Sequence, residues 1–164
     1  MAGDDSLGLE IIKRLEARGG CPCPLRSLAH PLALMEILET AGAVLLVDAV
    51  SSHMPPGSLH WVPLSSSEIE IRTLASLSSH GWGFAQTLEL ANALGRRIPR
   101  LVILGIEIGT VGVGEPRSPA VEQTMEMVLE RFPRLLSLLS NPASPLWKTP
   151  NHLPPGDTSF LSQH

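Results

Sequence analysis

The sequence predicts an α/β domain, a three-layer α/β/α sandwich with a mainly parallel twisted sheet. Two unbroken apolar runs, at 43–50 and 101–106, are typical of strands buried on both faces. Segments with helical spacing of apolar residues stand before, between and after them, and this alternation is typical of a layered sheet. The first run also carries one acid, Asp48, near its carboxyl end, where open α/β sheets place their ligands. On position alone, a simple cap of the next loop explains Asp48 equally well.

Size and composition limit the classes of function. The chain has 164 residues, enough for one domain with a substantial core, and 43% of them are hydrophobic. The formal net charge is −4 without any basic block, so we expect no nucleic-acid partner. No apolar run is long enough to span a membrane, and two acids near the N-terminus do not fit a signal peptide. Cys21 and Cys23 are badly spaced for a mutual disulfide and too few for a zinc site, so we expect a reduced, cytoplasmic protein.

The N-terminal part of the chain predicts two helices. Polar residues at 4–6 are suited to cap the first helix, which glycines at 19–20 end. The piece at 21–30 is irregular, although its second half is compatible with a short edge strand. Pro31 is suited to the first turn of the second helix, which Gly42 ends just before the strand at 43–50.

The central part predicts one more strand and one more helix. A turn at 55–57 leads into a strand at 59–63, which contains the bulky side chains Trp61 and Val62. The pattern at 65–77 is ambiguous between helix and strand, with helix or loop slightly favoured. A helix at 83–94 follows.

The last part begins with the apolar strand at 101–106, followed by Glu107 and a loop with three glycines. Ser118 and Pro119 open a strong helix that Pro133 is expected to bend or end, with one further apolar turn at 135–139. From residue 140 onward the chain is rich in Pro, Ser and Asn. We therefore predict an α/β domain at 1–139 and a disordered tail at 140–164.

Three residues from separate elements form the strongest candidate site. Asp5 precedes the first helix, Asp48 ends a strand, and His80 precedes the helix at 83–94. Strand ends and helix starts of this kind gather at one edge of a parallel sheet, and two carboxylates with one imidazole suit a divalent metal. The alternative interpretation is that Asp5 only caps its helix and His80 only adjoins another cap. The remaining histidines are interpreted as loop or surface residues: His30, His53, His60, His152 and His164.

Other constellations are weaker. No Gly-x-Ser-x-Gly elbow occurs, which disfavours a serine hydrolase of that type. The glycines at 109–114 lack the spacing of a phosphate-binding loop, so a flexible turn is the better interpretation. Cys21, Cys23 and His30 are weak candidates for a metal site, and free cysteines in a loop explain them more simply.

Six short motifs occur in order: GDDSLG at 3–8, LLVDA at 45–49, PG at 56–57, SHGWGFA at 79–85, LGIE at 104–107 and SPAV at 118–121. Together, from about residue 2 to 139, they resemble the hydrogenase maturation proteases. This resemblance implies an α/β/α endopeptidase that removes the C-terminal extension of a nickel–iron hydrogenase large-subunit precursor after nickel insertion. We expect that precursor to be the partner of this chain, and we expect the chain itself to be a monomer.

The resemblance also implies the site. The family's metal contacts correspond to Asp5, Asp48 and His80, the trio already chosen by position, with Asp5 and Asp48 as the catalytic candidates. In the family this metal is nickel, a cofactor of the substrate subunit, so the resemblance implies that the site is a recognition device. Polarisation of the scissile carbonyl by nickel and activation of water by a carboxylate both remain open, as does assignment to the aspartic-type peptidases.

Two features depart from the family pattern. Members normally begin with a buried strand and a Gly-x-Gly-Asn turn before the first motif, whereas this chain starts at Met1. We therefore expect the usual first strand to be missing, either from a start codon assigned too late or because the chain is a fragment. The residues RSLA at 26–29 replace a frequent Asp-Gly-Gly-Thr turn, which puts substrate contacts there in doubt.

Two other function classes stay open from the sequence. A truncated relative that binds nickel or the hydrogenase subunit without cleaving it is the main alternative. A flavodoxin-like domain that binds a nucleotide or flavin through residues 109–114 is the second.

Overall fold

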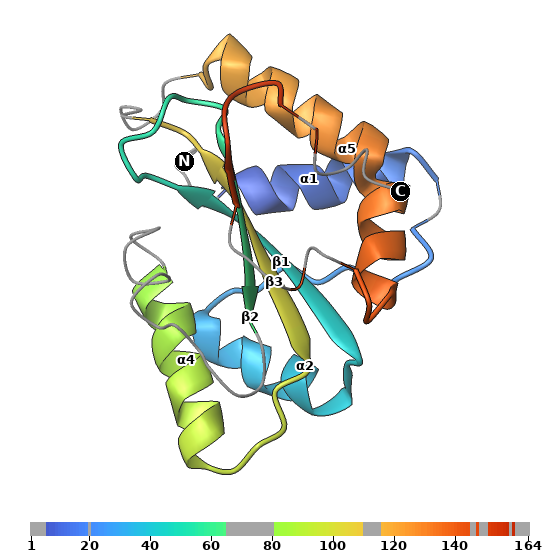
Figure 1. Cartoon of the computed structure of the whole chain (residues 1–164), viewed down its shortest axis with the longest axis vertical. Coiled ribbons are helices and arrows are strands. Elements are labelled where there is room, and N and C mark those ends of the chain that lie inside the picture. Colours follow the sequence, from blue (N-terminus) through green and yellow to red (C-terminus); the bar gives the residue numbers. More distant parts are fainter. Residues whose placement is uncertain are drawn as a thin grey trace.

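The computed structural model describes residues 6–19, 21–64, 81–109, 116–144, 147, 151–157 and 159. Within these residues, four strands form one sheet in the order β1-β3-β2-β4. Their bounds are Ala43–Val50 for β1, Leu59–Leu64 for β2, Arg100–Glu107 for β3 and Asn151–Leu153 for β4. The helices are α1 (Ser6–Ala17), η1 (Pro31–Ala33), α2 (Leu34–Thr40), α4 (Gly81–Ala93) and α5 (Pro119–Ser140). Figure 1 shows their arrangement around the sheet.

The sheet is mixed, with one reversed strand. β1 and β3 pair in parallel, β2 runs antiparallel to β3, and β4 runs antiparallel to β2. The strands β1, β3 and β4 therefore point the same way and β2 alone points back. The predicted α/β sandwich with a mainly parallel sheet is confirmed in these strand directions, and the reversed insertion of β2 is the feature that the sequence did not reveal. The missing first strand stays a prediction.

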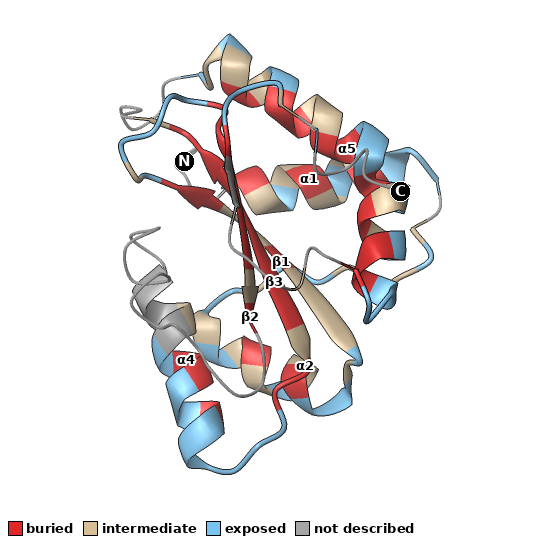
Figure 2. Ribbon diagram, viewed as in Figure 1, coloured by how far each residue is buried: buried red, intermediate tan, exposed pale blue. Residues whose placement is uncertain are grey.

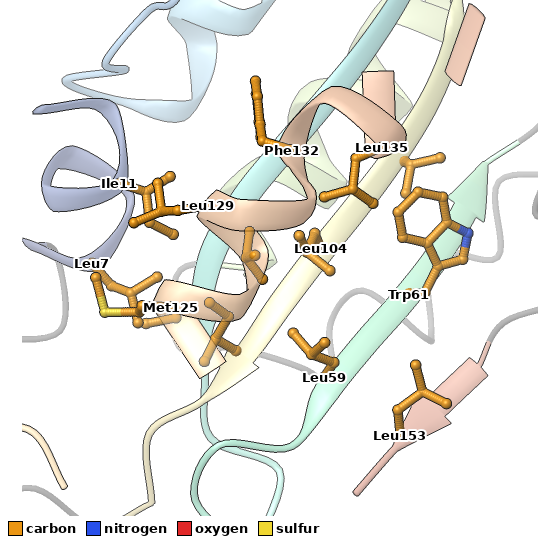
Figure 3. Packing of buried hydrophobic residues seen from close by; sticks show 14 of the residues in the cluster. Leu7, Ile11, Leu59, Trp61, Leu104, Met125, Leu129, Phe132, Leu135 and Leu153 are labelled. Carbon is orange, nitrogen blue, oxygen red and sulfur yellow. The ribbon is translucent and has the colours of Figure 1, made fainter. Parts of the chain in front are cut away.

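Helices cover both faces of the sheet and build two separate cores. On one face, α1 and α5 pack against side chains such as Leu59, Trp61 and Leu104 (Figure 3). On the other face, α2 and α4 pack against alternating residues of the same strands, among them Leu46, Val50 and Ile103. Successive side chains of a strand point to opposite faces, so one apolar strand contributes to both cores.

The strand β3 lies at the centre of this packing. Seven consecutive residues from Leu101 to Glu107 are buried, as its continuous red in Figure 2 shows. β1 is the outermost described strand on its side, and only Leu46, Ala49 and Val50 along it are buried. The expectation that both apolar runs are buried on both faces is therefore right for β3 and only partly right for β1, which among the described strands has β3 as its one neighbour.

The helix α5 continues through a proline. Ser118 caps its start by accepting a hydrogen bond from the amide of Val121 at 3.3 Å. Pro133 lacks an amide hydrogen, yet the helix runs on to Ser140 and changes direction along its length in Figure 1. The buried side chains beyond the proline, Leu135, Leu138 and Leu139, pack into the same core and stabilise this continuation.

Part of the segment predicted as a disordered tail is ordered. The three residues of β4 pair with Leu59–Trp61 of β2, and Leu153 is buried in the α1/α5 core. Trp147 is half-buried, donates from its indole nitrogen to the carbonyl of Asn141 at 3.0 Å, and lies 5.4 Å from the Arg100 guanidinium. Pairing of β4 with β2, burial of Leu153 and the contacts of Trp147 explain this order, which the local composition did not reveal.

Some expectations have other outcomes. The stretch 25–29 does not form a strand. The ambiguous segment 65–77 lies outside the described residues, as does most of the glycine loop at 109–114. Within the described parts of the chain, no helix is both long and apolar enough to cross a membrane.

Candidate functional site

Asp48 lies where the sequence placed it, near the carboxyl end of β1. Its partner across the parallel ladder is Gly105 of β3, and Gly105 also pairs with His60 of β2. Asp48, Gly105 and His60 therefore form one row across three strands, on the face that α2 and α4 cover. Asp48 is half-buried, and its Oδ1 accepts a hydrogen bond from the amide of Ala49 at 2.9 Å. A carboxylate that is accessible at a strand end is suited to bind a ligand.

The other two predicted site residues, Asp5 and His80, lie outside the described residues. The helices that directly follow them, α1 and α4, begin at Ser6 and Gly81. The first turn of α1 lies against the end of β1, because a β-carbon on Gly8 would come within 3.0 Å of the Val47 carbonyl oxygen. The metal role of Asp5, Asp48 and His80 stays a prediction. Among the described residues alone, no group of three or more His, Cys, Asp or Glu side chains is suited to a metal.

A buried polar cluster lies beside this strand end. Glu107 closes β3 and is 0% exposed, while His60 of β2 is 1% exposed. One carboxylate oxygen of Glu107, Oε2, is 3.1 Å from Nε2 of His60 and accepts from the Ser52 hydroxyl at 2.6 Å. The amide of Ser52 donates to both carboxylate oxygens, at 2.9 and 3.0 Å. We call Ser52, His60 and Glu107 the buried cluster.

The backbone of Glu107 is bound to the same loop. Its carbonyl accepts from the amide of Gly57 at 2.7 Å, and its amide donates to the carbonyl of Ser58 at 2.9 Å. Loop 51–58 connects β1 to β2, so Glu107 contacts both its beginning and its end. Gly57 in turn accepts at its carbonyl from the Thr124 hydroxyl of α5 at 2.7 Å. The loop after Asp48 is thus fixed from two sides.

The sequence interpretation of His60 as a loop or surface residue is wrong. His60 stands between Leu59 and Trp61 inside a strand that was itself predicted, and this position was the available signal for burial. Glu107 was noticed as the residue after an apolar strand and as the last residue of the LGIE motif, but no role was assigned to it. The structure brings the two side chains together because β2 pairs antiparallel with β3.

The two cysteines belong to the irregular segment that follows α1. Both thiols are free and half-buried, and they pack against the α1/α5 core. Burial, together with a hydrogen bond to Cys21, raises the pKa of the Cys23 thiol to about 12. A thiol protonated at neutral pH is a poor nucleophile and a poor metal ligand, which agrees with the interpretation of free loop cysteines.

Comparisons with known proteins identify one family and a shared fold. The model of the family described as "Hydrogenase maturation protease" matches residues 29–133, more than half of the chain. The hydrogenase maturating endopeptidase HybD from E. coli is 20% identical, with a TM-score of 0.61 over 92% of this chain and 89% of that one. A second endopeptidase structure from Escherichia coli is 21% identical, with a TM-score of 0.64 over 94% and 91%.

A hydrogenase 2 maturation peptidase from a Thaumarchaeota archaeon is also 21% identical, with a TM-score of 0.52 over 82% of this chain and 89% of that one. At these identities the three solved structures show a shared fold. No curated protein matches the chain.

Proposed function

Because the chain belongs to the hydrogenase maturation protease family, we propose that it removes the C-terminal extension from the large-subunit precursor of a nickel–iron hydrogenase. The family match supports an endopeptidase activity. The position of Asp48 supports an active site at the carboxyl end of β1. Asp48 lies within the matched residues, half-buried, at the edge of the sheet where α/β proteins bind ligands. This position of Asp48 is the observation that carries the proposal.

The nickel belongs to the substrate in this proposal. Asp5, Asp48 and His80 contact the nickel already inserted in the precursor, so that an empty precursor is not recognised. Two carboxylates and one imidazole are a donor set that suits this metal. Recognition of the metal would explain how cleavage waits for nickel insertion, and it would position the peptide for hydrolysis.

Hydrolysis needs a base for the attacking water. In our proposal one of the two carboxylates, Asp5 or Asp48, accepts a proton from water as the oxygen attacks the scissile carbonyl, and the proton then passes to the leaving amine. The carbon–nitrogen bond breaks, which yields the mature subunit and a free C-terminal peptide. The chain would act as a monomer in the cytoplasm, where its two thiols stay reduced.

The test is cleavage of a nickel-loaded precursor, followed by mass spectrometry of the large subunit. Asp48→Asn keeps the size of the side chain and removes its charge and basicity, and we expect the rate to fall by about 100-fold or more. Glu39→Gln is the matched control. Glu39 pairs with Arg96 near the amino ends of β1 and β3, so this variant loses the same charge at the opposite edge. It should cleave like the parent protein.

Three results would count against the proposal. Equal cleavage by Asp48→Asn and Glu39→Gln would remove Asp48 from the site. Equal cleavage of nickel-free and nickel-loaded precursor would show that nickel is not needed for recognition of the precursor. Tight binding of the loaded precursor by the parent protein without any cleavage would instead favour the non-catalytic binding protein.

A further inference from the structure

We propose that Glu107 is a positioning residue, whose buried carboxylate holds loop 51–58 and thereby fixes the end of β1 that carries Asp48. Ser52 and His60 are its partners in this role. The link to proteolysis rests on the proposed function of Asp48. The structural part, that Glu107 determines the placement of Asp48, stands independently and has its own readout.

A fully buried carboxylate must be satisfied by the protein. Taking a charge out of water is very unfavourable unless hydrogen bonds and charges replace the solvent. Glu107 has these partners in the buried cluster: an amide, a hydroxyl and an imidazole nitrogen, all within 3.1 Å. The chain therefore maintains a demanding interaction at this point of the core, which an apolar side chain would have filled more simply.

The carboxylate extends the β1–β3 ladder beyond the end of the strands. Val50 and Glu107 are the last paired residues, and the Val50 carbonyl accepts from the amide of Ile108 at 3.0 Å. Two residues farther along, the amide of Ser52 finds the Glu107 side chain in place of a backbone carbonyl. The chain that leaves β1 is thus held against β3 for two more residues, and Asp48 lies only four residues before Ser52, where it is held.

Loop 51–58 has a conformation that needs such support. His53, directly after Ser52, has a φ of 65°, the left-handed region that non-glycine residues seldom occupy. Strained residues of this kind persist where surrounding contacts over-determine the backbone, and they concentrate at functional sites. Glu107 supplies contacts to this loop on both sides of His53, through its side chain to Ser52 and through its backbone to Gly57 and Ser58.

Burial excludes direct contact between Glu107 and a substrate, so its effect on the reaction has to pass through the loop. A misplacement of a catalytic group by about 1 Å lowers a rate by about 100-fold. We expect Glu107→Ala to lower kcat by about this factor with little change in KM, because binding of the precursor depends on a larger surface. Glu107→Gln keeps one acceptor oxygen for Ser52 and should retain kcat within about tenfold, the effect of one hydrogen bond.

A destabilised control separates positioning from general loss of stability. Leu135 is fully buried in α5 on the opposite face of the sheet, and Leu135→Ala also destabilises the protein. It should keep kcat per folded molecule. Ser52→Ala removes the hydroxyl contacts to Glu107 and His60 and keeps the amide bonds to the Glu107 carboxylate. It is the substitute variant if Glu107→Ala does not fold, with an expected loss in kcat of about tenfold.

The amide signal of Ala49 in a ¹⁵N–¹H correlation spectrum of the full chain reports directly on Asp48, because this amide donates to the Asp48 carboxylate. Glu107→Ala or Ser52→Ala should shift that signal, and Leu135→Ala should leave it in place. The positioning role is refuted if Glu107→Ala matches Leu135→Ala in both kcat and the Ala49 signal. If the parent protein cleaves no precursor, the proposed function fails, and an unmoved Ala49 signal would then refute the positioning role separately.

Discussion

Gly57 is the residue whose replacement tests the anchoring of the site loop most directly. It has a φ of +86°, and a β-carbon there would lie 2.7 Å from the carbonyl oxygen and 2.9 Å from the carbonyl carbon of Ala120 in the first turn of α5. Both neighbouring atoms belong to the backbone, which cannot rotate away. Gly57→Ala must therefore displace either loop 51–58 or the start of α5.

The expected loss of stability has two parts. The left-handed backbone conformation costs an alanine about 1 kcal/mol relative to glycine. Overpacking of a tight site costs about 1–3 kcal/mol, and it includes weakening of the 2.7 Å bond from the Thr124 hydroxyl to the Gly57 carbonyl. We expect a total of about 3 kcal/mol, which for a chain of this length lowers Tm by about 6–12 °C.

Thermal unfolding followed by circular dichroism measures this effect, and Gly95→Ala is the matched control. Gly95 has a φ of +65°, but a β-carbon at this position would have no neighbouring atom within 4 Å. Gly95→Ala should therefore lose only the free energy of the left-handed backbone conformation, about 1 kcal/mol. The reasoning predicts a clear difference in Tm between the two variants. Equal shifts in Tm would refute the close approach of Gly57 to α5.

Two further predictions concern the α1/α5 side of the molecule. The pKa of the Cys23 thiol is raised to about 12, so we expect iodoacetamide to alkylate this thiol at pH 8 at least about 100-fold more slowly in the native protein than in urea. Mass spectrometry of the labelled peptide measures the two rates. Fast labelling of the native protein would contradict the burial of Cys23. Arg14 binds Glu10 at 2.9 Å and two glutamates of α5, so Arg14→Met should lower stability by about 1 kcal/mol at pH 7, measured by urea unfolding. The hydrogen bond from Arg14 lowers the pKa of Glu10, so this pair stabilises the fold above the unfolded pKa of about 4.3 and is lost as pH falls through the folded value. The difference between Arg14→Met and the parent protein should therefore shrink below about pH 4, and a difference that grew there would contradict the pairing.

The sequence by itself determined most of the local structure. The bounds of β1 and the position of Asp48 at its end follow from an unbroken apolar run that stops at turn residues. The start of α5 follows from Ser118 and Pro119, a cap and a first-turn proline. Such features are set by residues a few positions apart, and for that reason the chain displays them without its tertiary structure.

Only the tertiary structure decided which distant residues meet. The reversed direction of β2 and the formation of β4 depend on pairing with strands that are distant in the sequence. Neither feature produces a periodic pattern in the residues of β2 or β4 themselves. His60 and Glu107 are 47 positions apart, and each looks ordinary in its local context. Their contact exists because antiparallel pairing turns both side chains to one face of the sheet, where a buried charge must find a partner. The residue that we infer to position Asp48 was therefore visible only in the folded chain.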